Sequence, residues 1–192
     1  MNIEWEDMDI IQKSVSILEV NSMYALNTLK QYQYLCEFSN NHQELFDRAP
    51  YFLNTVINSL RSDILINIAC LIDDHKDAMS FIKLLKQLEQ SKEYRDLLKP
   101  ELSDIHTELL QYKPTIDTIN YLRDKFYAHN DKSIFKSSIE GQTFDVFQSS
   151  IWEDIMLLLN WIISACVRLR KAYGDDTISI FRTENDLPKL FK

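Results

Sequence analysis

The stretch "YLRDKFYAHND", residues 121–131, places several side chains that could do chemistry close together. Arg123 carries a planar guanidinium that can bind two phosphate oxygens at once. His129 follows six positions later, and a histidine with an ordinary pKa of about 6.5 exchanges protons at neutral pH. Such a pair suits proton transfer beside a phosphate whose charge the arginine stabilises. Candidates for supporting roles in the same stretch are Asp124, Tyr127 and Asn130.

The apolar spacing around this stretch predicts a helix over residues 115–129, which we call the motif helix. Its apolar line is Ile119, Leu122, Phe126 and His129, and the polar line one residue later is Asn120, Arg123, Tyr127 and Asn130. On a regular helix Arg123 and His129 lie about 120° apart around the axis and about 9 Å apart along it. They therefore do not share a face, although they can border one groove.

The same residues also permit a purely structural interpretation. A histidine that ends an apolar line can bond to a carbonyl in the core, and its charged form suits the C-terminal end of a helix. Arg123 can pair with a carboxylate, with Tyr127 covering it one turn later. Spacing alone leaves both interpretations open.

The composition predicts an all-α protein. The chain has 192 residues, 45% of them apolar and 26% charged, which suits one domain over residues 1–192. It has only two glycines, and glycine supplies the positive φ angles that tight turns need. We expect a bundle of long antiparallel helices, with a short loop or strand insertion over residues 132–147 and a C-terminal tail over residues 175–192.

Apolar stripes place the long helices. The first stripe, with alternating steps of three and four, consists of Met8, Ile11, Val15, Leu18, Ser22, Ala25, Leu29, Tyr32 and Cys36. A second helix begins near Pro50, and its buried stripe is Leu53, Ile57, Leu60, Ile64, Ile68 and Leu71. The spacing of the first stripe keeps one seam facing a partner helix, and packing within a bundle and pairing between chains both fit it.

A helix-capping serine, two prolines and a glycine indicate where the remaining helices begin and end. Ser80 follows the loop "IDDHKDAMS" and is a natural N-cap for the next helix. Residues 91–112 suggest shorter helical pieces, with Pro100 and Pro114 each in the first turn of a helix. A long apolar helix is expected over residues 147–173, and Gly174 is suited to end it.

Charge and cysteine usage exclude several classes of protein. The net charge of −8 argues against broad nonspecific binding of nucleic acid, although it allows a small basic pocket. The three cysteines, Cys36, Cys70 and Cys166, form no paired motif and are expected to be buried, reduced thiols. The acidic N-terminus does not resemble a signal peptide, and the most apolar run, residues 155–167, is shorter than the roughly 20 residues of a membrane span. We expect a cytoplasmic protein without a membrane segment.

The sequence suggests neither a metal ion nor another cofactor. The cluster "DDHKD", residues 73–77, lacks the spacing of a calcium-binding EF-hand loop and suits a solvated loop. His106, with Asp104 and Glu108 nearby, lacks the arrangement of a zinc protease. The segment from Arg123 to His129 is therefore the candidate site for any catalysis.

The stretch "LRDKFYAHND" resembles the Arg-x4–6-His motif of the HEPN superfamily, the helical domains named for higher eukaryotes and prokaryotes nucleotide-binding. Here the form is Arg-x5-His, with Asp124 directly after the arginine. This residue pattern is most similar to that of the U-type branch of bacterial abortive-infection proteins. The upstream stretch "LIDDHKDAMSFIKLLKQL" is also similar to that branch, in which a long helix ends in Leu-x-Asp and a serine opens the next helix. The resemblance covers about residues 50–170.

This resemblance implies a metal-independent endoribonuclease of a phage-defence or toxin–antitoxin system. Its catalytic residues would be Arg123 and His129, and its supporting residues would be Asp124, Tyr127 and Asn130. It implies RNA as the substrate, a homodimer that brings the motifs of two chains into one cleft, and an antitoxin or nucleotidyltransferase partner. The alternative from a different functional class is a non-catalytic HEPN module that binds a nucleotide or a protein partner.

Overall fold

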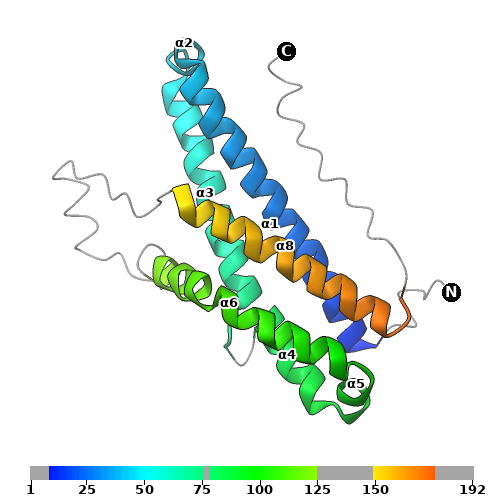
Figure 1. Ribbon diagram of the computed structural model, residues 1–192. Coiled ribbons are helices and arrows are strands. Elements are labelled where there is room, and N and C mark those ends of the chain that lie inside the picture. Colours follow the sequence, from blue (N-terminus) through cyan, green and yellow to red (C-terminus); the bar gives the residue numbers. More distant parts are fainter. Residues whose placement is uncertain (1–8, 76–77, 125–148, 176–192) are drawn as a thin grey trace.

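The computed structural model (Figure 1) describes residues 9–75, 78–124 and 149–175. All the regular structure in these ranges is helical, which confirms the all-α prediction. The helices are α1 (Ile10–Asn41), α2 (Gln43–Phe46), α3 (Pro50–Ile72), α4 (Phe81–Gln90), α5 (Lys92–Leu97), α6 (Lys99–Arg123) and α8 (Ser149–Ala172). The insertion expected over residues 132–147, and the tail after residue 175, lie outside the described residues.

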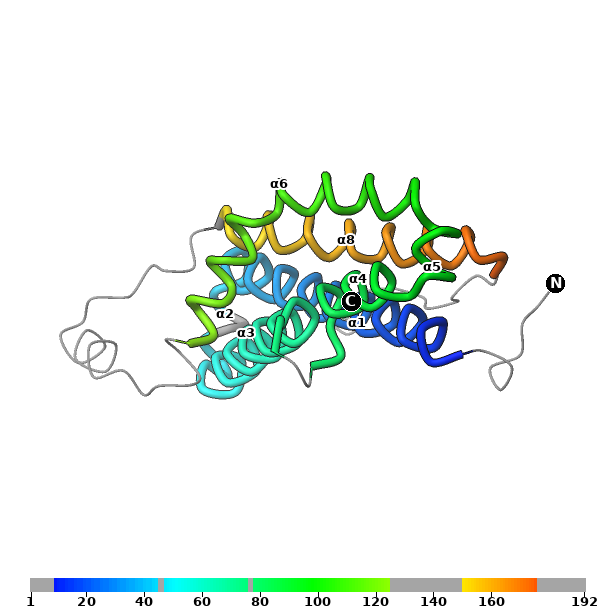
Figure 2. Tube along the Cα trace, turned by 90° about the horizontal axis from the view of Figure 1, so that it is seen from below, coloured from blue at the N-terminus to red at the C-terminus, as the bar shows by residue number. Residues whose placement is uncertain are grey.

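Helix α1 is the centre of the bundle. It packs mainly against α3 and α8, and α6 packs against both of these helices (Figures 1 and 2). The predicted stripe of α1 faces the core, since Val15, Leu18 and Leu29 are fully buried. The stripe of α3 is buried over its C-terminal part, at Ile64, Ile68 and Leu71, whereas its N-terminal part lies partly open. The core therefore sits where α1, α3, α6 and α8 meet.

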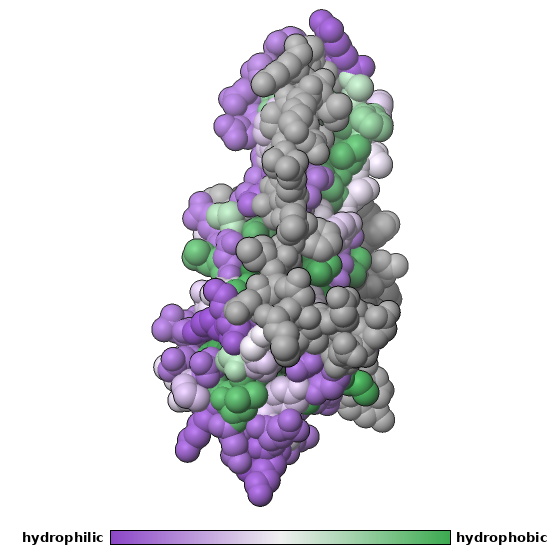
Figure 3. Space-filling view, turned by 90° about the vertical axis from the view of Figure 1, so that its right-hand side faces the viewer, coloured by the Kyte–Doolittle hydropathy of each residue, from purple (hydrophilic) through white to green (hydrophobic). Residues whose placement is uncertain are grey.

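Helices α3 and α8 are each long and apolar enough to cross a membrane by length and composition. Core helices of soluble proteins pass the same test, and both helices supply buried side chains, such as Ile68 of α3 and Leu158 of α8. On the face shown in Figure 3, hydrophilic residues separate small apolar patches wherever the described residues are visible. No membrane is indicated, and the cytoplasmic location stays a prediction.

The cysteines only partly follow the prediction of buried thiols. All three are free, but Cys70 is exposed, Cys36 is half-buried and only Cys166 is fully buried. Burial raises the pKa of the Cys166 thiol well above its ordinary value. Cys70 lies on the exposed face of α3, so the prediction that it is buried is wrong.

The predicted beginning of the motif helix at residue 115 is wrong. Helix α6 begins at Lys99, with Pro100 in its first turn as expected, and continues through Pro114 to Arg123. A proline inside a helix removes one backbone hydrogen bond and bends the axis, and α6 bends in this region (Figure 2). Both halves are anchored in the same core, by Ile105 before the bend and Ile119 after it. This shared burial explains why the helix continues through the proline.

The C-terminal end of α8 is closed as the sequence predicts. Gly174 has a φ of 89°, a conformation that glycine adopts easily. The Gly174 N–H donates to the carbonyl of Lys171 at 3.0 Å, and the Asp175 N–H donates to the carbonyl of Arg170 at 3.0 Å. These two bonds form a Schellman motif. The motif returns Asp175 towards the preceding turn of α8.

We expect Gly174→Ala to lower the free energy of unfolding by about 1–2 kcal/mol, the cost of a Cβ in the left-handed conformation. No atom lies within 4 Å of the position that the added Cβ would take, so steric collision adds nothing. Urea denaturation followed by circular dichroism measures the loss. Gly174→Asn is the control, because asparagine tolerates this conformation better than alanine. Equal losses for both variants would contradict the backbone explanation.

Asp175 belongs to a buried ion network that joins α8 to α1. Arg170 Nε donates to Glu19 Oε2 at 2.6 Å, and Nη2 donates to Glu19 Oε1 at 3.2 Å. Arg170 Nη1 lies 3.5 Å from Asp175 Oδ2. Burial lowers the pKa of Arg170, but the hydrogen bonds and charge of Glu19, helped by Asp175, outweigh burial and raise it. The guanidinium therefore stays charged inside the protein.

A second, more exposed network joins α6 to α8. Glu108 accepts hydrogen bonds from Arg168 Nη1 at 3.0 Å, from Arg168 Nη2 at 2.5 Å and from Trp161 Nε1 at 2.6 Å. The hydrogen bonds from Arg168, and then that from Trp161, lower the pKa of the Glu108 carboxyl group. This contact holds the N-terminal half of α6, before its bend, against α8.

Candidate functional site

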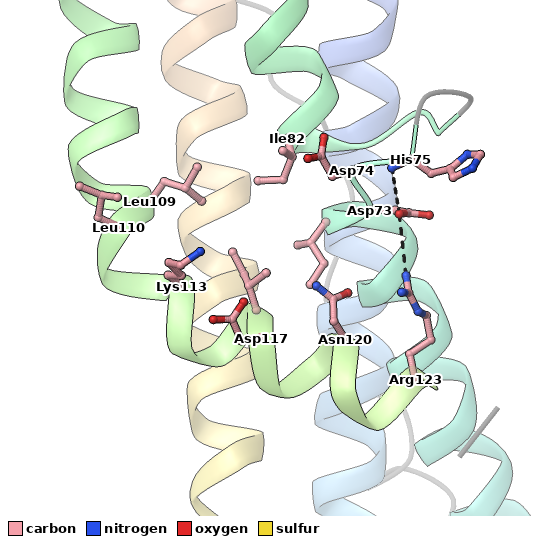
Figure 4. A pocket seen from close by; sticks show the side chains of 12 residues that line it. Asp73, Asp74, His75, Ile82, Leu109, Leu110, Lys113, Asp117, Asn120 and Arg123 are labelled. Atoms are coloured by element: carbon pink, nitrogen blue, oxygen red, sulfur yellow. Dashed lines mark hydrogen bonds and ion pairs between the residues drawn. The ribbon is translucent and has the colours of Figure 1, made fainter. Parts of the chain in front are cut away.

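Arg123 lies at the C-terminal end of α6, with its guanidinium held between two carboxylates (Figure 4). Its Nε donates to Asp124 Oδ1 at 2.9 Å, and its Nη1 lies 3.8 Å from Asp73 Oδ1. The first contact is a hydrogen bond, whereas the second is a looser ion pair. The Arg123 side chain remains 33% exposed. An arginine fixed in this way keeps N–H donors that can reach an incoming anion.

The local structure after α3 explains the position of Asp73. The buried Ser80 hydroxyl donates to the Asp73 carbonyl and accepts from the Lys83 N–H at 3.2 Å. The N-cap predicted from the sequence thus also ties down the end of the preceding helix. The Asp73 carboxylate accepts from the His75 N–H at 3.1 Å. These contacts hold the carboxylate where it faces Arg123.

A pocket of about 490 Å³ opens beside Arg123, between α6 and the turn from α3 to α4. Figure 4 shows side chains from both sides lining it. Its apolar wall consists of Ile72, Ile82, Leu109, Leu110 and Ile116. Its polar rim consists of Asp73, Asp74, His75, Lys113, Asp117, Asn120 and Arg123. The volume is within the range of about 300–1,000 Å³ that small-molecule sites occupy.

Two acidic groups of the rim have partners. Asp73 pairs with Arg123, and Asp74 pairs with Lys86 of α4. The hydrogen bond from Lys86 lowers the pKa of the Asp74 carboxyl group. Both carboxylates are therefore engaged by cations, and the turn after α3 is fastened to α6 and α4.

The structure brings together Arg123 and Asp124 of the predicted site. The other three predicted residues, His129, Tyr127 and Asn130, lie outside the described residues. Of the two predicted lines on the helix, Ile119 and Leu122 are fully buried. The apolar line is thus confirmed for its described half, and the separation of Arg123 from His129 stays a prediction.

The sequence interpretation missed the pairing of Asp73 with Arg123. The sequence places Asp73 in a weak metal cluster and in the Leu-x-Asp of the family resemblance, and neither predicts an arginine partner. No group of metal-binding side chains occurs among the described residues. The signal that could have found it is the Leu-x-Asp at residues 71–73, which the resemblance places at the end of a long helix. The two stretches that carry the resemblance thus meet in space.

These features define the class of the protein. Long antiparallel helices form an all-α bundle, and Arg123, at the C-terminal end of α6, borders a pocket. An all-α bundle of this kind is consistent with a HEPN domain. The sequence model of the AbiU2 family of HEPN domains matches residues 12–160. The chain therefore belongs to the AbiU2 family, in the abortive-infection U-type branch of the HEPN superfamily.

The matched range contains both halves of the candidate site. It runs from the first turns of α1 into α8, and so includes the turn after α3 and the whole Arg-x5-His sequence. Searches of curated proteins and of solved structures returned no match. The family membership thus rests on the AbiU2 match, and the likeness extends further towards the N-terminus than the predicted residues 50–170.

Proposed function

We propose that the protein is a metal-independent endoribonuclease of a phage-defence or toxin–antitoxin system, with Arg123 and His129 as its catalytic residues. The observation that carries this proposal is the placement of Arg123 at the edge of a pocket, oriented by Asp73 and Asp124 and still one-third exposed. Membership of an abortive-infection HEPN family supports it. RNA is the substrate that we propose.

The chemistry is an internal transfer within RNA. The 2′-oxygen attacks the adjacent phosphorus, a new P–O bond forms, and the bond from phosphorus to the 5′-oxygen breaks. One histidine removes the 2′-hydroxyl proton, and a histidine in its charged form gives a proton to the leaving oxygen. Arg123 stabilises the negative charge that builds on the phosphoryl oxygens. The products are a 2′,3′-cyclic phosphate and a free 5′-hydroxyl.

A homodimer would supply the two histidines. Because Arg123 and His129 are about 120° apart on a regular helix, one chain does not present both to one phosphate on a common face. Two copies of the motif facing each other remove this difficulty. We therefore propose a site shared between two chains, and an antitoxin or a nucleotidyltransferase as the partner that controls it.

A second candidate function follows from the charges around Arg123. Two carboxylates already contact its guanidinium, and they repel a phosphate as well as orienting the arginine. In a non-catalytic HEPN module this network would be structural, and the neighbouring pocket would bind a nucleotide or a protein partner. The net charge of −8 is compatible with this alternative.

RNA cleavage by the purified protein in EDTA, beside His129→Ala, tests the proposal. EDTA inactivates most contaminating metal-dependent nucleases. We expect the wild type to cleave and the variant to lose cleavage, because the variant lacks the group that transfers protons. Equal cleavage by both proteins would assign the activity to a contaminant or another site. Cleavage by neither protein, with RNA from infected and uninfected cells, would favour the binding module.

A further inference from the structure

The pocket beside Arg123 has a part that the cleavage chemistry does not use. A phosphate and a ribose are polar and need an arginine and proton-transfer groups, whereas five aliphatic side chains line the inner wall. An apolar wall of this kind suits a flat heterocyclic ring, whose faces are poorly hydrated. The polar side chains of the rim then determine which heterocyclic base binds most tightly.

The polar side chains of the rim divide into two groups. Asp73 and Asp74 are engaged by Arg123 and Lys86, and the His75 side chain points away from the pocket in Figure 4. The second group, Lys113, Asp117 and Asn120, makes no side-chain hydrogen bond or ion pair with any other residue in the described ranges. These three remain available to a ligand.

The three available side chains come from one face of α6. Their spacing of four and then three residues places them in successive turns of a helix. Figure 4 shows Lys113 and Asp117 close together at one side of the pocket, with Asn120 between them and Arg123. Asp117 and Arg123 are six residues apart, about 9 Å along a regular helix and about 120° around it, and both line the pocket. One nucleotide can span this length, with its base at Asp117 and its phosphate at Arg123.

We propose that this pocket binds a guanine base of the RNA, next to the phosphate that Arg123 contacts. The Lys113 ammonium donates to O6 of the base, and the Asp117 carboxylate accepts from N1–H and from the N2 amino group. Asn120 completes the rim on the side of the sugar. The proposal rests on the proposed function for RNA as the natural ligand, but the base-binding pocket can be tested without any cleavage.

The donor and acceptor pattern separates guanine from the other bases. Guanine alone offers two neighbouring N–H donors on its pairing edge, which match the two oxygens of one carboxylate. Adenine and cytosine offer an amino group beside a ring nitrogen acceptor, whose lone pair would face the second carboxylate oxygen. Uracil has a single N–H between two carbonyl groups. A good bidentate pair discriminates by about 1–3 kcal/mol, which is about 5- to 150-fold in affinity.

Isothermal titration calorimetry of the full chain in EDTA, with 5′-GMP, 5′-AMP, 5′-CMP and 5′-UMP, tests the pocket. We expect 5′-GMP to bind about 5- to 150-fold more tightly than the others. Asp117→Asn should remove this preference, because the amide supplies only one acceptor. Asp104→Asn is the matched control, since Asp104 is an exposed acid of the same helix outside the pocket. Circular dichroism melting establishes that both variants fold.

The outcomes separate this inference from the proposed function. A preference for 5′-GMP that is lost in Asp117→Asn and kept in Asp104→Asn supports the pocket, whether or not the protein cleaves RNA. Equal affinity for the four nucleotides overturns the inference, even if RNA is cleaved in EDTA. A preference that both variants keep also overturns it, because the base would then bind elsewhere.

Discussion

Replacing Arg170 with methionine is expected to lower the free energy of unfolding by about 3–5 kcal/mol. Methionine keeps much of the volume, so the loss comes from the charge and not from a large cavity. Glu19 and Asp175 are each only 1% exposed, and Arg170 is the cation that the structure places between them. Without it, Glu19 and Asp175 both lose the buried cation that they contact, and removing one partner of a buried ion network is strongly destabilising.

Urea denaturation at neutral pH, followed by circular dichroism, measures this loss. The matched control is Arg168→Met, which also removes an arginine of α8 that binds a carboxylate on another helix. The Arg168 side chain is 33% exposed and the Glu108 side chain is 36% exposed, so solvent screens this ion pair. We therefore expect Arg168→Met to lower the free energy of unfolding by less than about 1 kcal/mol. Equal losses for the two variants would contradict the argument from burial.

A rescue experiment separates charge from packing. Adding Glu19→Gln and Asp175→Asn to Arg170→Met removes the two negative charges that Arg170 contacts while keeping side chains of nearly the same size. We expect the triple variant to recover part of the lost stability, because neutral amides are cheaper to bury than carboxylates. A triple variant less stable than Arg170→Met alone would show that packing, and not charge, causes the loss.

The sequence predicts local features well because they depend on neighbours along the chain. The stripe of α1, the N-cap at Ser80 and the left-handed Gly174 each follow from residues within a turn or two. Pro114 shows the limit of this reasoning. Its local preference is for a first turn, but Ile105 and Ile119 are buried in one core on either side of it, and tertiary packing outweighs that preference.

The pairs that matter most at the site and in the core are distant in the sequence. Asp73 and Arg123 lie on different helices, and so do Glu19 and Arg170. Helical spacing treats each of these residues as part of a solvated face, because nothing in its own segment reveals the partner. The family resemblance includes residues 71–73 and the stretch around Arg123, but it does not predict that Asp73 and Arg123 pair. For the core network, no comparable signal was present.

Replacing Arg123 with glutamine is expected to lower the rate of RNA cleavage in EDTA by about 100- to 1,000-fold. This is the typical effect of removing one donor that stabilises charge in a transition state. Glutamine keeps an N–H donor and most of the length of the side chain, but it lacks the charge. Single-turnover cleavage of a labelled RNA measures the effect on the chemical step directly.

Arg123→Lys distinguishes catalysis from a structural role. Lysine keeps the charge and the ion pairs with Asp73 and Asp124, but it lacks the planar fork that binds two phosphate oxygens. We expect its stability to match that of the wild type and its cleavage rate to lie between those of the wild type and Arg123→Gln. If the network around Arg123 were only structural, Arg123→Gln would melt earlier, and neither variant would change cleavage at a temperature where it is folded. The ion pair with Asp73 is partly exposed, so its loss costs at most about 1 kcal/mol. A large loss of cleavage with little loss of stability is therefore the result that would place Arg123 in the reaction itself.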